Sequence, residues 1–156
     1  MPIMKRLIFT LLLSFSAFVT ALCQSYNDKA DNIVGQYEII SNGEKAKVAV
    51  TKNQSGNYDI QIYWLENPYN PDGSRALDLK NPDKSLRTVP MDKVVLVRNL
   101  GYDKAKKQWS GAKIYDPSRG IRANVVCTLN EKNNLYLRAT LLGIGESQEW
   151  KRINDR

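Results

Sequence analysis

The sequence predicts an all-β protein, an eight-stranded antiparallel up-and-down barrel with a long loop and a short helix between the third and fourth strands. Three observations predict it. Eight short segments alternate apolar and polar residues with the period of two expected of strands. Loops of about three to seven residues join most of these segments as successive hairpins, and a single insertion lacks periodicity. A two-sheet sandwich is the alternative, but sequential hairpins favour a closed meander over Greek-key crossings.

The first half of the chain predicts three strands, at residues 33–40, 45–52 and 58–65. The polar residues 26–32 before them are expected to form a loose lead-in. In the second strand Ala46, Val48 and Val50 share one face and lysines lie on the other, which is typical of a strand with one buried face. The third strand is expected to place Tyr58, Ile60, Ile62 and Trp64 together on its apolar face.

The periodicity stops between residues 66 and 91, where prolines and glycine interrupt any regular element. A loop of this length inside a compact domain usually has a role of its own. Within it, residues 81–87 predict a short helix. Asn81 is expected to cap it, Pro82 fits the first helical position, and Asp83 lies in the first turn, near the positive end of the helix dipole.

Five further strands are expected, at residues 93–100, 108–115, 121–129, 135–141 and 146–153. In the strand at 108–115 the alternation places Trp109 and Tyr115 on the same face. It ends in a turn, because Asp116 can accept backbone N–H bonds, Pro117 fixes φ and Gly120 permits the conformation in which the chain leaves the turn.

The first 23 residues have the three parts of a secretory signal: Lys5 and Arg6, an apolar run at 7–19, and small residues at positions 21 and 23. The run is too short for a membrane-spanning helix and no later run is longer, so no transmembrane segment is expected. The sequence therefore predicts a signal peptide at 1–23 and a single β-barrel domain at 24–156, periplasmic or secreted. A lipoprotein acylated at Cys23 is the less favoured alternative, because Leu22 is large for the residue before that cysteine.

The formal net charge is +7 at pH 7, and the basic residues are scattered along the strands instead of forming an arm or stripe. This pattern is typical of solvated strand faces, so no nucleic-acid partner is expected. We expect a monomer. Once the signal is removed Cys127 is the only thiol, and no internal disulfide can form. Cys127 falls on the same face of its strand as Ala123, Val125 and Leu129, which predicts that it is buried and packs as a small apolar side chain. The alternative is that it is a reactive nucleophile.

Several motifs together resemble one family. They are the string from Tyr58 to Leu65, the Asn81-Pro82-Asp83 string with Asp78, Leu86 and Arg87 around it, the Ile114-Tyr115-Asp116-Pro117 string with Trp109 and Gly111 before it, and residues 135–143. The chain resembles, over residues 33–150, the bacterial exported proteins called domain of unknown function family 2147. The resemblance implies a signal peptide, a small β-barrel similar to lipocalins and no established activity.

Two positions depart from the family pattern. Tyr37 stands where the family usually has Trp, and Ala112 stands where a second glycine often follows Gly111. These departures bear on a shared pocket more than on the fold.

The sequence contains no histidine, which excludes Ser-His-Asp and Cys-His nucleophilic sites and histidine zinc sites. We expect no catalytic residues, no metal, no cofactor and no enzyme activity. The alternative is a hydrolase of cell-envelope polymers that uses Asp78, Asp83 and Asp116 as acid and base. It requires two carboxyl groups facing each other across a cleft, one of them with a raised pKa.

The candidate ligand-binding residues combine the aromatic side chains of the predicted strands with the polar residues of the insertion and the following turn. They are Tyr58, Trp64, Asp78, Asp83, Arg87, Trp109, Tyr115, Asp116, Tyr136 and Trp150. Tyr and Trp have polar tips, so several of them converging in one barrel would line a pocket for an amphipathic molecule. The favoured hypothesis is non-enzymatic binding of a small apolar or amphipathic ligand, with residues 66–91 as a partial lid. An interaction protein without a pocket is the other alternative.

Overall fold

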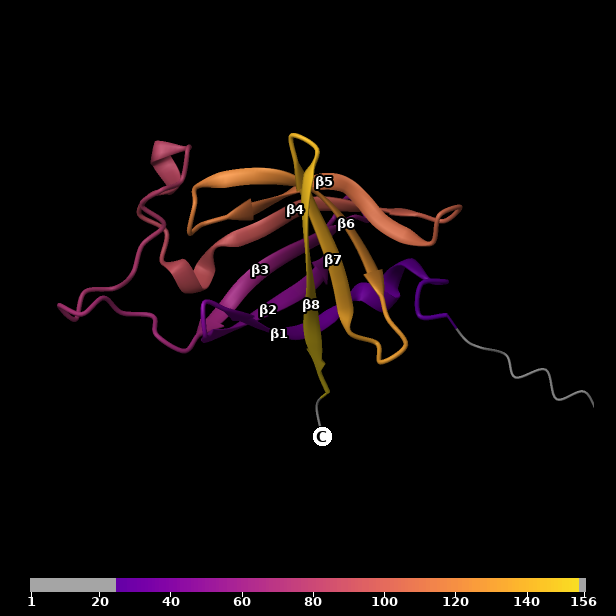
Figure 1. The fold of residues 1–156 in the computed structure, drawn as a ribbon, viewed down its shortest axis with the longest axis horizontal. Helices are drawn as coiled ribbons and strands as arrows, with labels where there is room; N and C mark the ends of the chain where they lie inside the picture. Colours follow the sequence, from indigo (N-terminus) through magenta and orange to yellow (C-terminus); the bar gives the residue numbers. More distant parts are fainter. Residues whose placement is uncertain (1–24, 155–156) are drawn as a thin grey trace, which may run out of the picture.

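The computed structural model describes residues 25–154 and confirms the eight-stranded antiparallel barrel, in which each strand pairs with the next (Figure 1). The strands are β1 (Gly35–Ser41), β2 (Glu44–Lys52), β3 (Tyr58–Leu65), β4 (Val95–Asp103), β5 (Gln108–Asp116), β6 (Ile121–Leu129), β7 (Leu135–Leu141) and β8 (Ile144–Ile153). The predicted signal peptide at 1–23, with Cys23, lies outside the described residues. Among residues 25–154, no helix is long and apolar enough to cross a membrane.

The β1–β8 seam closes the barrel. It consists of the pairs Gln36↔Ile153, Tyr37↔Arg152 and Glu38↔Lys151. These pairs involve only the start of β1 and the end of β8, so within the described residues the rest of β8, from Ile144 to Trp150, pairs with β7 alone. The barrel is therefore closed at one end of this seam and splayed at the other.

Short hairpins join the strands where the sequence predicts turns. Asn42 and Gly43 both have positive φ, 52° and 84°, as a two-residue turn that matches the twist of its strands requires. Leu142 and Gly143 repeat this geometry between β7 and β8, with φ of 50° and 82°. Leucine has no side-chain feature that favours this left-handed conformation, and Leu142 is 94% exposed.

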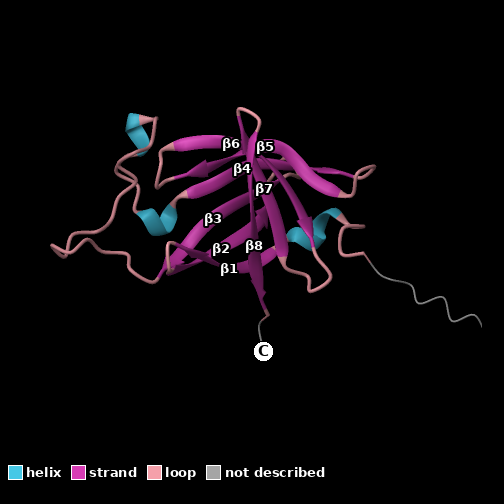
Figure 2. Ribbon diagram, in the orientation of Figure 1, coloured by secondary structure: helices cyan, strands magenta, loops and turns pink. Residues whose placement is uncertain are grey.

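The chain before β1 covers one end of the barrel, which we call the sealed end (Figure 2, where the helical turn η1 lies beside the strands). η1 (Ala30–Ile33) is a 3₁₀ turn, and Ile33 is fully buried. Inward-facing aromatic side chains hold this segment through its backbone carbonyls: Trp109 Nε1 donates to Ala30 O at 2.9 Å and Tyr37 Oη donates to Ile33 O at 2.8 Å.

The prediction of a loose lead-in at 26–32 and a strand from residue 33 was therefore wrong. The strand begins at Gly35. Buried aromatic tips need hydrogen-bond acceptors, and the carbonyls of this segment supply them. Arg152 adds two more bonds from β8, to Asn32 O at 2.7 Å and Val34 O at 2.9 Å.

The long segment between β3 and β4 projects from the opposite end of the barrel (Figure 1). Its only helical turns are two 3₁₀ turns, η2 (Lys84–Leu86) and η3 (Met91–Lys93), so the short helix predicted at 81–87 is present only as the 3₁₀ turn η2. Asp83, in an extended conformation, is the N-cap, and its carboxylate accepts from Ser85 N at 2.9 Å. Asn81 instead turns the chain: its Oδ1 accepts from Asp83 N and its Nδ2 donates to Asp78. These local bonds compete with helix formation.

The same segment lies against the outside of the barrel. Its Asp78 accepts a hydrogen bond from Tyr115 on β5, and Lys80 Nζ donates to Ser118 O in the β5–β6 turn at 2.6 Å. Both contacts reach the outward side of β5 or its turn, because Ala112 and Ile114 are the inward-facing residues there. The expectation that residues 66–91 cover the barrel mouth is not supported by these contacts.

Candidate functional site

The inward-facing residues of β5 to β8 form layers, because strand pairing sets them opposite one another. From the sealed end, the layers are Leu129, Leu135 and Trp150; then Trp109, Cys127, Leu137 and Gln148; then Ala112, Val125, Ala139 and Glu146; then Ile114, Ala123, Leu141 and Ile144. The first layers contain large side chains that fill the barrel, and the third contains two alanines. On the side of β5 to β8, the interior is therefore packed with large side chains at the sealed end and lined by small ones farther along, whereas Val97 of β4, opposite Ile114, is only 1% exposed.

Exposure to solvent increases along these layers. Leu135 and Leu137 are 0% and 3% exposed, whereas Leu141 and Ile144 are 41% and 76% exposed. Ala112, Ala123 and Ala139 are partly exposed although they face inward. Gln148 and Glu146 are exposed because the β1–β8 seam does not extend to them. We call this end of the barrel the open end.

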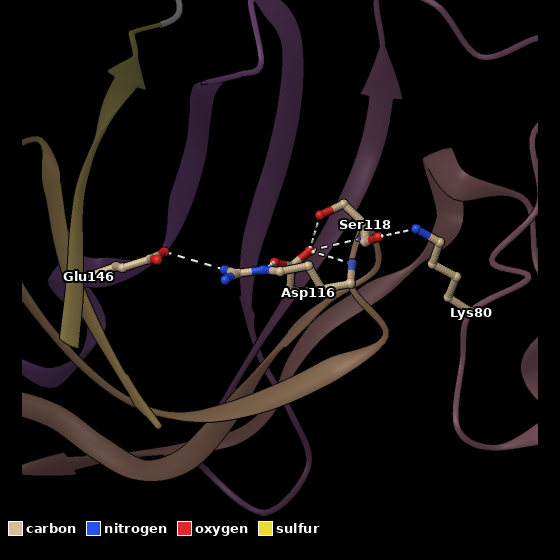
Figure 3. A network of polar contacts seen from close by, with 5 residues as sticks. Lys80, Asp116, Ser118 and Glu146 are labelled. Carbon is tan, nitrogen blue, oxygen red and sulfur yellow. Dashed lines mark hydrogen bonds and ion pairs between the residues drawn. The ribbon is translucent and has the colours of Figure 1, made fainter. Parts of the chain in front are cut away.

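A small polar network lies at the rim of the open end (Figure 3). Asp116 binds Arg119 Nε through Oδ2 at 2.6 Å and accepts from Ser118 Oγ and N through Oδ1. Arg119 reaches on to Glu146 Oε2 on β8 at 3.3 Å, and Lys80 from the long segment binds Ser118 O. The network ties the β5–β6 turn to β8 and to the long segment.

The predicted aromatic residues do not converge in one pocket. Tyr58, Trp109 and Trp150 are buried in the barrel, and each has a partner for its polar tip: Asp31, Ala30 O and Gln148 respectively. Trp64 and Tyr136 are 39% and 43% exposed on the outside. Trp64 leaves the apolar face because the β2–β3 register shifts next to Val48, and it then packs under Lys47 Nζ at 4.9 Å.

Tyr115 is buried, but on the outward side of β5, opposite to Trp109. The expectation that the two share a face was wrong, because the register shifts between Trp109 and Ala112 at Gly111, whose φ is +82°. Such a bulge moves every later side chain of the strand to the other face. Tyr115 Oη donates to Asp78 Oδ1 at 2.7 Å, and Asn81 Nδ2 donates to Asp78 Oδ2 at 2.7 Å.

The polar candidates are likewise held by local bonds. Arg87 Nε donates to Asn81 O at 2.8 Å, and Asp83 caps η2. Hydrogen bonds from Ser85 lower the pKa of Asp83. Burial acts to raise the pKa of Asp116, but the bonds from Ser118 and Arg119 outweigh it and the pKa is lowered. Both shifts are opposite to the raised pKa that a general acid requires.

Two hollows on the surface are large enough for a small molecule. One, of about 760 Å³, lies outside the sealed end between Tyr26 and the β6–β7 turn. The other, of about 520 Å³, lies between the long segment and the outward side of β3 to β6; we call it the outer groove. Neither is lined by the predicted aromatic set. Of the predicted residues, only Asp78 lines the outer groove.

The basic residues of the outer groove were not predicted from the sequence; they are Lys93, Arg98, Lys113 and Arg122. They are scattered along the chain, so no run of charge marks them. The signal that could have found them is their place on the outward faces of strands next to the insertion.

Cys127 is fully buried, which confirms its prediction as a small hydrophobe. Burial raises the pKa of its thiol to about 12, so it lacks the thiolate that a nucleophile needs. Within residues 25–154, no three His, Cys, Asp or Glu side chains gather closely enough to hold a metal ion.

Comparisons with known proteins agree with the fold. A family model described as "Uncharacterized protein conserved in bacteria (DUF2147)" matches residues 35–152. Among solved structures, the chain is similar to the protein HP1028 of the human pathogen Helicobacter pylori, which is described as belonging to the lipocalin family. The TM-score is 0.62 at 24% identity, over 79% of this chain and 84% of that one. No curated protein matches at a significant level.

Proposed function

This chain belongs to the DUF2147 family, and we propose that it is a non-enzymatic protein that binds a small apolar or amphipathic ligand in the open end of its barrel. The observation that carries the proposal is the gradient of packing inside the barrel. The sealed end is filled by large side chains and covered by η1, whereas the open end has inward-facing alanines that are partly exposed. Eight-stranded barrels of this size either fill their interior or hold one small ligand.

The chemistry of the open end favours an amphipathic molecule. Its inward-facing walls are apolar, with Ile39, Ala112, Ile114, Ala123 and Ala139 partly exposed. Polar groups lie at the splayed seam, Gln148 and Glu146, and at the rim. A ligand with an apolar body inside and a polar group at the rim would satisfy both surfaces.

The fold likeness adds indirect support. HP1028 is described as a lipocalin, and small-ligand binding in a barrel is typical of that architecture. The hydrolase alternative lacks such support, because Asp83 and Asp116 have lowered pKa values and Asp78 binds Tyr115 and Asn81 with its two oxygens. The proposal includes export: residues 1–23 have the sequence pattern of a signal peptide, and with export the ligand would be met in the periplasm or outside the cell.

The proposal is tested with N-phenyl-1-naphthylamine, a neutral apolar fluorophore, on residues 24–156. We expect a saturable rise in fluorescence. Ala139→Phe, which fills the third layer, should weaken binding at least about tenfold, which is about 1.4 kcal/mol. Ala49→Phe, on the outward side of β2, is the matched control and should bind as the parent does.

A second variant that fills the open end and a second method make the test independent of any single variant. If Ala139→Phe does not fold, Ala123→Leu places a smaller side chain nearer the open end. Native mass spectrometry of the protein purified from its own host would reveal a ligand retained from the cell and the mass of the processed chain. Absence of saturable binding in the parent, or equal binding in the filled variants, contradicts the proposal.

A further inference from the structure

The outer groove has an unusual balance of charge for a concave surface. Four cationic side chains line it, Lys93, Arg98, Lys113 and Arg122, against one carboxylate, Asp78. All four cations are exposed, and they come from η3, β4, β5 and β6. Like charges held together in a hollow repel each other, and a bound anion would relieve this repulsion.

The carboxylate does not neutralise these cations by contact. Asp78 is 1% exposed, and its two oxygens accept hydrogen bonds from the neutral donors Tyr115 Oη and Asn81 Nδ2, both at 2.7 Å. No ion pair joins any of the four cations to an acidic residue within the described part of the chain. Asp83, which is not among the residues that line the groove, interacts electrostatically with Arg122 but forms no ion pair with it, so the charge of the four cations is not neutralised by contact.

One of the cations is held in place. The Arg122 guanidinium lies 4.8 Å from the centre of the Tyr115 ring, and Tyr115 is itself fixed by Asp78. A guanidinium stacked on an aromatic ring keeps its N–H groups free along its edge, where they can bind an oxyanion in pairs. On the adjoining strands, Arg98 and Lys113 flank the Val97↔Ile114 pair of β4 and β5. The pairing of β4 with β5 thus brings two further hydrogen-bond donors, Arg98 and Lys113, to the outer groove.

The opposite wall of the groove is apolar. Leu86 and Val89 of the long segment line it and are partly buried. The volume of about 520 Å³ is within the range of pockets for small organic ligands and exceeds what a bare inorganic ion needs.

We infer that the outer groove is a second binding site, which takes an oxyanion, a phosphate ester or carboxylate, attached to a small apolar body. The oxyanion lies against Arg98, Lys113 and Arg122, and the apolar body lies against Leu86 and Val89. This site goes beyond the proposed function, because it lies outside the barrel and its ligand is anionic. Whether the outer groove binds an oxyanion does not depend on whether the open end of the barrel binds a ligand.

The test titrates ¹⁵N-labelled residues 24–156 with phenyl phosphate, inorganic phosphate and benzyl alcohol at fixed ionic strength. Phenyl phosphate should shift the amide signals of Lys113, Arg122 and Asn81 saturably and bind more tightly than inorganic phosphate. Benzyl alcohol, which lacks the oxyanion, should leave them unchanged. The inference is overturned if phenyl phosphate causes no saturable shift and phosphatidylglycerol vesicles do not bind the protein either.

The variant Arg98→Gln/Lys113→Gln removes two charges from exposed positions and should weaken phenyl phosphate binding at least about tenfold, since bonds to charged groups are the strong ones. Lys104→Gln/Lys106→Gln removes the same charge from the β4–β5 turn and should bind as the parent does. An equal loss in both would mean general attraction of anions and would contradict a built site. Ala139→Phe should keep full phenyl phosphate binding, which separates this inference from the proposed function.

Vesicles distinguish a soluble ligand from a lipid headgroup. Phosphatidylglycerol vesicles are compared with phosphatidylcholine vesicles in a sedimentation assay with the same variants. Binding to phosphatidylglycerol that depends on Arg98 and Lys113, without binding of phenyl phosphate, assigns the oxyanion to a membrane lipid. Binding of phenyl phosphate without vesicle binding assigns it to a soluble molecule.

Discussion

The hydroxyl of Tyr115 on β5 donates a 2.7 Å hydrogen bond to Oδ1 of Asp78, 37 residues earlier in the chain. Both residues are buried, at 2% and 1% exposure. This bond fixes the long segment to the outside of the barrel and supports the Arg122 guanidinium that stacks on the Tyr115 ring. A single pair thus connects the placement of the loop to the charge of the outer groove.

Tyr115→Phe is expected to destabilise the protein by about 1.5–3 kcal/mol, the range for a hydrogen bond to a charged group, because it leaves Asp78 with one donor fewer. Urea unfolding of Tyr115→Phe, Asp78→Asn and the double variant measures the coupling between the two side chains. Tyr136→Phe, on an exposed tyrosine, is the control and should change little. If the losses of stability of the two single variants add up to that of the double variant, Tyr115 and Asp78 have no measurable interaction energy.

Gly120→Ala tests the contact between the β5–β6 turn and the long segment. Gly120 has a φ of +69°, and an added Cβ would collide with the carbonyl oxygen of Lys80. The left-handed backbone alone costs about 1–2 kcal/mol, and the collision adds to it. Gly56→Ala is the matched control, since Gly56 has a φ of +80° but nothing within 4 Å of the added atom.

The expected readout is a larger loss of stability for Gly120→Ala than for Gly56→Ala in the same urea series. Amide signals of residues 78–81 should move in the first variant alone. Equal losses of stability in the two variants would show that Lys80 moves away from the added Cβ at no energetic cost, and that the contact between the turn and the long segment is loose.

Stability should fall at alkaline pH between about 10 and 12. Burial raises the pKa of Tyr37 to about 12 from its usual value near 10, although the Arg152 guanidinium over its ring opposes the shift. The folded state then resists deprotonation that the unfolded chain undergoes, so this contribution is present below pH 10 and is lost as pH rises towards 12. Burial also raises the pKa values of Tyr58 and Tyr115, so both act in the same direction.

The free energy of unfolding, measured from pH 8 to pH 12, checks this expectation. Tyr37→Phe should show a smaller decline over that window, and Tyr136→Phe should decline as the parent does. If the free energy of unfolding of Tyr37→Phe declines with pH as steeply as that of the parent, Tyr37 does not cause the decline.

Cys127 should resist thiol reagents in the native protein. Its side chain is fully buried and burial raises the pKa of its thiol to about 12, so very little thiolate is present or reachable at pH 8. Modification by a disulfide reagent should therefore follow opening of the barrel, and its rate should rise with urea in step with unfolding. Rapid modification without urea would mean that the filled layers of the barrel open readily.

Period-two alternation predicts the strands because most of them have one side buried, β8 being the exception, and the hairpin loops then leave the meander as the simplest topology. Where a bulge intervenes the same reasoning fails. Gly111 reverses the side on which Tyr115 lies, and the shift next to Val48 puts Trp64 outside. At Gly111 the sequence does carry a sign of the bulge, because Lys113 has the same parity as Trp109 whereas the apolar Ala112 and Ile114 have the other.

Two features could not be predicted from the sequence, for different reasons: the cover over the sealed end and the outer groove. Residues 27–33 cover the sealed end with backbone carbonyls, which every sequence has, so no side-chain pattern marks them. The groove gathers cations from β4, β5 and β6 that are distant along the chain. Asp78, Asn81 and Tyr115 were part of a recognisable motif, but their mutual bonds depend on the packing of the loop.

The β1–β8 seam has a consequence for selectivity by length. β1 and β8 pair only near the sealed end, so between the open end and Trp150 no backbone pairing joins the two strands. If the proposed ligand lies in the open end, a linear guest longer than that site would extend between these unpaired strands instead of coiling inside. Affinity is then expected to rise with chain length only until the pocket is filled and to remain level for longer homologues.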